Sequence, residues 1–179
     1  ATDQTDCLAN EAQLFNSNFE NGTPGWEFSD PRAWSVIQTD DSNTPALRGE
    51  GHVHAYAGEN WREVVWRMLV KIINGNVHLN FHWRDSNRYL VSFAEDGINV
   101  TRNPQSAMGM GSSGIRHTLG EWHVVEIGLQ KDLFYVAVDG FLEIEQREPD
   151  PLPPGGIWLE VLDDSEVLFD EIFVCKPGA

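Results

Sequence analysis

The residues from Val64 to Val100 alternate between apolar and polar side chains, and this alternation predicts four β-strands joined by three tight turns. Asn74-Gly75 is typical of a two-residue type I′ hairpin turn. With this turn, four apolar pairs face each other across the first two strands: Ile72 and Val77, Val70 and Leu79, Met68 and Phe81, and Trp66 and Trp83. Because the turn and the alternation agree on one register, we expect one face of this sheet to be core.

Two further turns extend this apolar face to the third and fourth strands. The links at 85–87 and 96–97 are short enough for hairpins. The apolar pairs that they create are Trp83 with Tyr89, Phe81 with Val91, Leu79 with Phe93, and Phe93 with Val100. The predicted core face therefore spans all four strands.

The opposite face of this predicted sheet is polar and rich in hydrogen-bonding groups. In the same register Arg67 lies across from His82, and Lys71 lies across from His78. The face carries these side chains: Arg67, Lys71, His78, Asn80, His82, Arg84 and Ser92. Such a plane of donors and acceptors on a rigid sheet is the candidate functional surface, and the alternative is an ordinary solvated face.

The rest of the chain also predicts short strands. Alternating or apolar segments occur at 12–19, 33–38, 52–57, 121–129, 133–138, 141–146, 157–162 and 166–174. The Gly/Ser/Pro-rich stretch 103–114 predicts a loop. Amphipathic helical periodicity is absent from the sequence. Many short strands between turn signals predict an all-β protein, an antiparallel β-sandwich or jelly roll in which residues 1–179 form a single domain.

Composition narrows the possible partners. The net charge of −16 argues against nucleic acid and against anionic membrane surfaces, since both require a basic footprint. No apolar run is long enough to span a bilayer. The acidity suits cation binding or simple solubility. We expect no nucleic-acid partner, no membrane partner and a monomeric chain.

The two cysteines, Cys7 and Cys175, lie near opposite ends of the chain. A pair that brackets the fold predicts a disulfide that joins the terminal strands, and two free thiols are the alternative. A disulfide implies an oxidising compartment. The sequence begins at Ala1 without Met, as in a secreted protein after signal removal or in a cloned fragment. We therefore expect a secreted protein, extracellular or periplasmic.

Three groups of motifs resemble a known superfamily. They are Asn18–Gly22 followed by Gly25-Trp26, Phe169–Val174, and Gly120–Val125 followed by Tyr135–Gly140. The first two resemble the opening and closing strands of jelly-roll carbohydrate-binding modules. The third resembles the W-x-x-V … V-D-G pattern of laminin-G-like and concanavalin-like domains. The resemblance implies a concanavalin-like jelly roll over nearly the whole chain. It leaves the activity open, since this superfamily includes lectins, adhesion domains, glycosidases and polysaccharide lyases.

The resemblance implies glycan binding on the concave sheet. Amide, imidazole and guanidinium groups pair well with sugar hydroxyls, and Arg adds carboxylate or sulfate recognition. Trp66 and Trp83 fall on the predicted apolar face and are assigned to the core. The expected ligand-binding residues are Arg67, His78, Asn80, His82 and Arg84, with Trp61 and Trp122 stacking at the rim.

Two metal sites are considered. The resembling modules hold a structural calcium between a Glu near the first strand and an Asp on the last, which correspond to Glu20 and Asp170. Calcium needs several oxygen ligands, and the alternatives are a solvated Glu20 and an Asp170 that caps a strand. His52 and His54 lie on one face of a strand, ~6–7 Å apart by the strand rise, and could share a zinc ion, although no third ligand is evident.

Catalysis is the main rival to binding. The paired carboxylates of laminarinase-like glycosidases are absent from the sequence. An Arg67, His78, Asn80, His82 and Tyr89 cluster could imitate a polysaccharide lyase, but the lyase motifs are missing and Tyr89 falls on the core face. We therefore predict non-catalytic polysaccharide binding. The alternatives are a lyase or glycosidase that uses the His/Arg face, and an extracellular adhesion module that binds protein.

Overall fold

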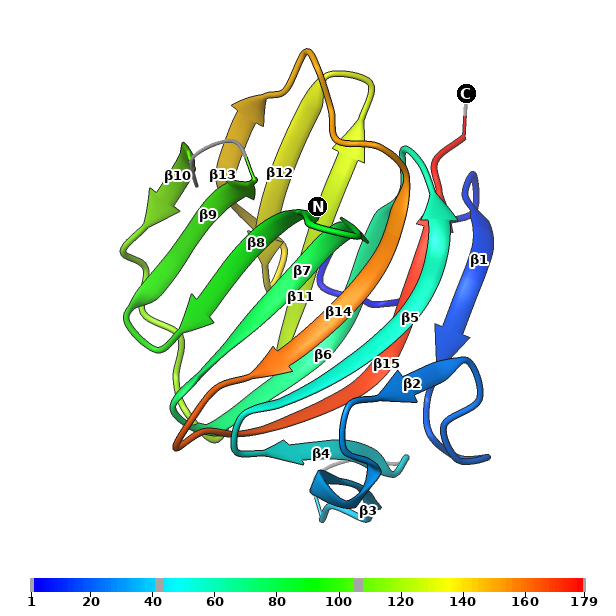
Figure 1. Ribbon diagram of the computed structural model, residues 1–179, viewed down its shortest axis with the longest axis vertical. Helices are drawn as coiled ribbons and strands as arrows, with labels where there is room; N and C mark the ends of the chain where they lie inside the picture. The colour runs from blue at the N-terminus through cyan, green and yellow to red at the C-terminus, as the bar shows by residue number, and fades with distance from the viewer. Residues whose placement is uncertain (1, 41–43, 105–107, 179) are drawn as a thin grey trace.

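The computed structural model describes residues 2–40, 44–104 and 108–178, which form two antiparallel β-sheets packed face to face (Figure 1). Sheet A has the order β13-β12-β11-β6-β15-β4-β3, and β1 pairs with the other part of β15. Its strands are β1 (Ala12–Ser17), β3 (Trp34–Ile37), β4 (Ala46–Glu50), β6 (Val65–Asn74), β11 (His123–Gln130), β12 (Leu133–Val138), β13 (Phe141–Arg147) and β15 (Glu166–Lys176).

Sheet B has the order β10-β9-β8-β7-β14-β5-β2 and forms the front layer of Figure 1. A single turn of 3₁₀ helix, Pro31–Ala33, precedes β3. No helix capable of crossing a bilayer occurs in the described part of the chain. The strands of sheet B are β2 (Trp26–Phe28), β5 (Val53–Trp61), β7 (Asn76–Arg84), β8 (Asn87–Ala94), β9 (Gly97–Asn103), β10 (Met108–Ser113) and β14 (Gly155–Val161).

The all-β sandwich prediction is confirmed, and the strands predicted from alternation all exist, β12 with its predicted ends and the others with shifted ends. Three short strands, β2, β4 and β10, were not predicted. The stretch 103–114 is not only a loop, because β10 pairs with β9 along 108–113. Glycines carry no alternation signal, so this edge strand is invisible to a hydrophobic pattern.

The Asn74-Gly75 turn does not join neighbouring strands of one sheet, and the predicted register across it is wrong. β6 pairs with β11 and β15 in sheet A, whereas β7 pairs with β8 and β14 in sheet B. The turn is a corner between the two layers, and a β-carbon on Gly75 would lie 2.0 Å from the Ser165 hydroxyl. The apolar faces of β6 and β7 therefore meet across the core instead of side by side.

The side chains of β6, and of β7 as far as Phe81, that were predicted to pair across the turn still face the core. Met68 and Phe81 are both buried, and the rings of Trp66 and Phe81 lie 6.2 Å apart between the sheets. Within sheet B, Phe81 pairs with Tyr89. The predicted β7–β8 and β8–β9 pairings are shifted by two residues, and a shift of two does not by itself move a side chain to the other face.

The core fills the space between the two layers. Its largest fully buried side chains come from both sheets: Trp66, Tyr89, Phe81, Phe93, Phe134 and Phe169. Each such burial contributes about 1.5–3 kcal/mol relative to exposure. The interior is therefore occupied by side chains, and ligand chemistry has to be sought on the outer faces.

The Cys7–Cys175 disulfide is present in the structure, and its Cα atoms are 5.7 Å apart. Cys175 lies on β15, and Cys7 belongs to the segment that precedes β1. The bond therefore ties the N-terminal segment to the last strand, as predicted from the positions of the two cysteines.

Candidate functional site

The outer face of sheet B carries an ordered set of polar and aromatic side chains over β5, β14 and β7. In Figure 1, β14 runs between β5 and β7. Glu160 of β14 pairs with His54 on one side and His78 on the other, and Trp158 pairs with Tyr56 and Asn80 in the same way. Because side chains alternate along a strand, these rows share the outward face.

A β-bulge in β7 changes which residues reach this face. The register with β8 shifts between Phe81 and Arg84, and His82 has a φ of 50°. An extra residue in a strand exchanges the faces of the residues that follow it. His82 is 2% exposed and contacts Tyr89 inside the molecule, whereas Trp83 emerges on the outer face. The predicted positions of His82 and Trp83 are thus reversed.

Trp83 joins two other rings to form an aromatic platform, which consists of Tyr56, Trp83 and Trp158. The ring of Tyr56 lies 4.6 Å from that of Trp83 and 5.5 Å from that of Trp158, and the two indoles are 6.0 Å apart. The Arg88 guanidinium lies 4.7 Å above the Trp158 ring. Arg88 therefore covers part of Trp158, and all three rings of the platform are half-buried.

Glu160 organises the polar row beside the platform. Its Oε1 lies 3.0 Å from His78 Nδ1, 3.3 Å from Arg88 Nη1 and 3.5 Å from Asn80 Nδ2. Burial by itself would raise the pKa of Glu160, but the hydrogen bond and charge of His78, then Arg88 and Asn80, outweigh burial and lower the pKa to about 2. Glu160 is an ionised hydrogen-bond acceptor at neutral pH.

The structure supplies the third residue that a zinc site at His52 and His54 lacked. Ligand atoms of these two histidines and Glu160 lie within 4.8 Å of one another, and His52 Nε2 is 3.7 Å from Glu160 Oε2. However, Trp158 Nε1 is 2.9 Å from His54 Nδ1. An indole N–H is only a donor, so Nδ1 is the acceptor and the proton of neutral His54 is on Nε2. That tautomer suits hydrogen bonding better than metal ligation.

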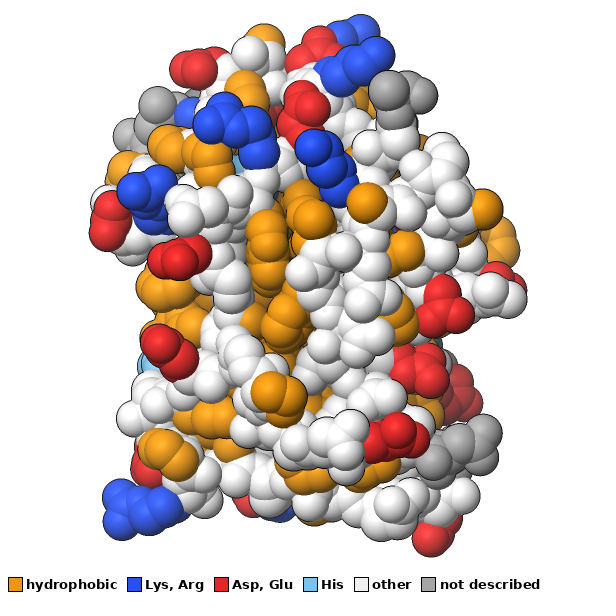
Figure 2. Space-filling model, turned by 90° about the vertical axis from the view of Figure 1, so that its right-hand side faces the viewer, with side chains coloured by type: hydrophobic (Ala, Val, Ile, Leu, Met, Phe, Trp, Pro, Cys, Tyr) orange, Lys and Arg blue, Asp and Glu red, His pale blue; other side chains and the backbone are white. Residues whose placement is uncertain are grey.

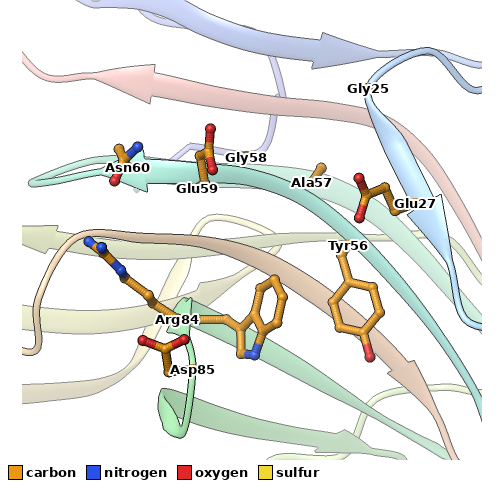
Figure 3. A pocket seen from close by; sticks show the side chains of 10 residues that line it. Gly25, Glu27, Tyr56, Ala57, Gly58, Glu59, Asn60, Arg84 and Asp85 are labelled. Atoms are coloured by element: carbon orange, nitrogen blue, oxygen red, sulfur yellow. The ribbon is translucent and has the colours of Figure 1, made fainter.

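A pocket of about 590 Å³ adjoins the platform (Figure 3). Tyr56 and Trp83 contribute rings to its lining, and Gly58 leaves part of its surface without a side chain. A β-carbon on Gly58, whose φ is +71°, would lie 2.3 Å from the Trp61 ring, so a larger residue is excluded there. The exposed polar residues of the lining are Glu27, Glu59, Asn60, Arg84 and Asp85.

Arg67 is not on this face, which corrects the prediction that it shares a surface with His78 and His82. It lies on sheet A, is 2% exposed and forms a buried ion network. Arg67 Nη1 is 2.7 Å from Glu11 Oε1, and Arg67 Nε is 3.0 Å from Glu126 Oε1. Tyr135 donates to the other oxygen of Glu126 at 2.6 Å. The N-terminal segment, residues 2–11, closes over this network.

The two tryptophans expected at the rim lie elsewhere. Trp61 packs against Phe15 of β1, with ring centroids 5.6 Å apart. Figure 2 shows a band of apolar side chains on the side of the molecule that lies to the right in Figure 1. Trp122 lies on the sheet A side, where Lys71 Nζ is 5.6 Å from its ring. Of the seven predicted ligand-binding residues, His78, Asn80 and Arg84 alone lie on the outer face of sheet B or at its pocket.

The two residues expected to hold calcium are Glu20, which follows β1, and Asp170, which lies within β15. Ser17 of β1 pairs with Ile172, so the chain that continues to Glu20 runs toward the part of β15 that contains Asp170. Asp170 is completely buried, and its carboxylate accepts hydrogen bonds from the Thr44 hydroxyl and, at 2.7 Å, from the Glu171 N–H. Glu20 is exposed.

Sequence reasoning missed most of the platform. Tyr56 alternates with buried Ala55 and Ala57, and Trp158 alternates with buried Ile157 and Leu159. The same alternation rule that was applied to the meander could have marked both as outward-facing. It could not have shown that β14 lies between β5 and β7, because strand order in a sheet does not follow chain order.

No family model and no curated protein matches the sequence. Solved structures match the fold. They include carbohydrate-binding module CBM66 from Bacillus subtilis, with 16% identity, a TM-score of 0.65, and coverage of 84% of this chain and 94% of that one. A Bacillus licheniformis β-glucanase has 12% identity and a TM-score of 0.71, and the match covers 89% of this chain and 96% of that one.

A third similar structure is domain 4 of AbnA, a GH43 extracellular arabinanase from Geobacillus stearothermophilus, in complex with arabinotriose. Its identity is 8% and its TM-score 0.70, with 94% of each chain covered. Identities this low show shared architecture and not shared activity. The chain therefore has the antiparallel jelly-roll fold that these binding modules and glucanases share.

Proposed function

We propose that this protein binds a carbohydrate, without turnover, on the outer face of sheet B. The observation that carries the proposal is the β-bulge that turns Trp83 outward beside Tyr56 at the pocket. Flat apolar ring faces next to a polar wall suit a sugar, which has an apolar ring face and a hydroxyl rim. The similar structures include a carbohydrate-binding module and a domain in complex with arabinotriose, which supports this choice.

The polar row beside the platform matches sugar hydroxyls. His54 offers an N–H donor at Nε2, because its Nδ1 is occupied by the Trp158 indole. Burial lowers the pKa of His54, which favours this neutral donor form. Glu160 Oε2 offers an acceptor. Asn80 and Arg88 hold each other at 3.0 Å, so the row is rigid before any ligand arrives.

The contacts of Glu160 favour binding over hydrolysis. Glycosidases use two carboxyl groups roughly 5–10 Å apart, one of them a protonated acid. Glu160 is the buried carboxylate in the rows over β5, β14 and β7, and its pKa is lowered, which removes it as an acid at neutral pH. Its Oε1 is also occupied by His78, Asn80 and Arg88. This carboxylate therefore orders the face.

The proposal includes a secreted location and a structural calcium. The disulfide suits an oxidising compartment. A completely buried Asp170 carboxylate is a suitable ligand for a hard cation, with Glu20 and backbone carbonyls as further oxygen donors. The test of calcium is the melting temperature with calcium and with a chelator. We expect a rise with calcium that is lost in Asp170→Asn, and equal temperatures for the wild type in both conditions would contradict it.

The binding proposal is tested with a glycan array, followed by titration calorimetry on the best ligand. We expect Trp83→Ala to weaken binding about 5- to 100-fold, which corresponds to the ~1–3 kcal/mol of one lost aromatic contact. Trp122→Ala, a matched tryptophan on the other sheet, should bind like the wild type. Absence of any glycan ligand, or equal losses in both variants, would contradict the proposal.

A further inference from the structure

We infer that the pocket beside Trp83 selects uncharged glycans and excludes those that carry carboxylate or sulfate groups. This inference rests on the carbohydrate-binding function proposed above and names its ligand class. It reverses the expectation from the sequence, in which Arg67 and Arg84 on one face suggested recognition of acidic sugars. The evidence is the set of charges around the pocket and the way in which the nearby cations are occupied.

The pocket lining is acidic. Glu27, Glu59 and Asp85 are exposed carboxylates of the lining, and Arg84 is its guanidinium. Figure 3 shows Glu27 and Glu59 on the β2–β5 side and Arg84 and Asp85 at the end of β7. Three negative groups against one positive group leave the pocket net negative.

The guanidinium of Arg88, in the polar row beside the platform, already contacts protein groups. Arg88 Nη1 donates to Asn80 Oδ1 at 3.0 Å and lies 3.3 Å from Glu160 Oε1. The same guanidinium stacks on Trp158 at 4.7 Å. A sulfate or carboxylate could recruit Arg88 only by breaking these contacts and leaving the buried Glu160 without its cation.

Arg67, one of the two arginines expected from the sequence to bind the sugar, is buried on sheet A between Glu11 and Glu126. The net charge of −16 adds a general repulsion of anions. Within a Debye length of about 8 Å, repulsion between exposed like charges is felt, and it weakens with salt. An anionic chain therefore meets net repulsion at the pocket, whose described lining has one guanidinium, Arg84, against three carboxylates.

The test compares charged and uncharged forms of one backbone. The best neutral ligand from the array is converted to a carboxymethyl derivative and, as a control for added bulk, to a hydroxyethyl derivative. We expect the carboxymethyl form to bind about tenfold more weakly than the hydroxyethyl form, since each of three like charges contributes roughly 1.5- to fivefold. The difference should shrink in 0.5 M salt, taken as a concentration at which the Debye length is about 4 Å.

A triple variant assigns this selectivity to the pocket. Glu27→Gln/Glu59→Gln/Asp85→Asn should bind the carboxymethyl form about tenfold more tightly than the wild type does, from the same charge contributions. A control with the same change in net charge, Glu121→Gln/Glu145→Gln/Asp150→Asn, alters exposed residues outside the pocket. The affinity of this control for the carboxymethyl form should stay within about twofold of the wild-type affinity, because distant exposed charges are screened.

Three results would overturn the inference. They are equal affinity of the wild type for the two derivatives, an equal gain of affinity for the carboxymethyl form in both triple variants, or a preference for anionic glycans on the array. A protein that binds no glycan of either class fails the proposed function itself. That outcome is distinct from binding without charge selectivity, which would overturn the inference and leave the function standing.

Discussion

The two outer faces of the sandwich both carry an ionic network, and only one of them is open. On sheet A, Arg67 is 2% exposed beneath the N-terminal segment, which supplies Glu11 as its partner. On sheet B, Glu160 gathers His78, Arg88 and Asn80 at a surface that borders a pocket. Alternation of polar and apolar residues marks an outer face of a sheet equally well in both cases. Whether that face meets solvent depends on where distant parts of the chain pass.

The largest expected effect comes from breaking the closed network. Arg67→Ala leaves the buried Glu11 and Glu126 carboxylates without their cation, which should cost about 3–5 kcal/mol of unfolding free energy. Urea denaturation measures this cost. Arg116→Ala is the control, because Arg116 pairs with Glu95 at the surface with a 77% exposed side chain, and it should cost less than ~1 kcal/mol. Similar losses for the two variants would contradict the buried network.

The next effect comes from releasing the segment that covers sheet A. Cys7→Ser/Cys175→Ser should lower the unfolding free energy by about 2–5 kcal/mol, the usual cost of removing a native disulfide. Limited proteolysis should then cut within residues 2–11 sooner than in the wild type. Glycan affinity should be unchanged, because the pocket is on the other sheet. A parallel loss of affinity would show that the two faces are coupled.

Replacing the carboxylate of the open network gives a smaller, pH-dependent effect. The pKa of Glu160 in the folded protein is lowered from 4.5 to about 2. Its ionised form therefore stabilises the fold above pH 4.5, and this contribution disappears as the pH falls toward 2. Glu160→Gln should cost about 1–2 kcal/mol at pH 7, reduced from the full shift because the group is partly solvated.

Urea denaturation of the wild type and Glu160→Gln from pH 7 to pH 2.5 measures this contribution. The difference between the two proteins should be constant above pH 5 and should narrow below it. A difference that widens as the pH falls would have the wrong sign and would remove the assigned role of Glu160 as an ionised acceptor.

The smallest effect is expected from removing a hydroxyl of the platform. Tyr56→Phe retains the ring that lies 4.6 Å from Trp83. If Tyr56 acts through stacking, titration calorimetry should give Tyr56→Phe a glycan affinity within about twofold of the wild type. Tyr56→Ala should bind the glycan about 5- to 100-fold more weakly. A large loss in Tyr56→Phe would show that the hydroxyl, and not the ring, contacts the sugar.

Alternation along single strands predicted much of the fold. It identified which side chains of β6, β8 and β9, and of β7 as far as Phe81, face the core, and the positions of Cys7 and Cys175 predicted the disulfide. Alternation does not reveal whether two apolar strands lie side by side or face to face. The Asn74-Gly75 corner was therefore mistaken for a hairpin.

The candidate site was predicted only in part. His78 and Asn80 were assigned to the correct outward face of β7. One inserted residue near His82 exchanged that side chain with Trp83, and a bulge of this kind leaves no periodic signal. Tyr56 and Trp158 reach the platform through the order of strands β5, β14 and β7, which depends on long-range pairing that a local pattern does not encode.

The most direct test of an open binding face on sheet B is an NMR titration that follows the indole N–H signals of the seven tryptophans. The probe is the best neutral glycan from the array. At saturation we expect the signals of Trp83 and Trp158 to shift, since Trp83 lines the pocket and the Trp158 N–H is hydrogen-bonded to His54. The signal of Trp122 should stay in place. A shift of Trp122 with Trp83 and Trp158 unchanged would place the ligand on the other sheet and contradict the account.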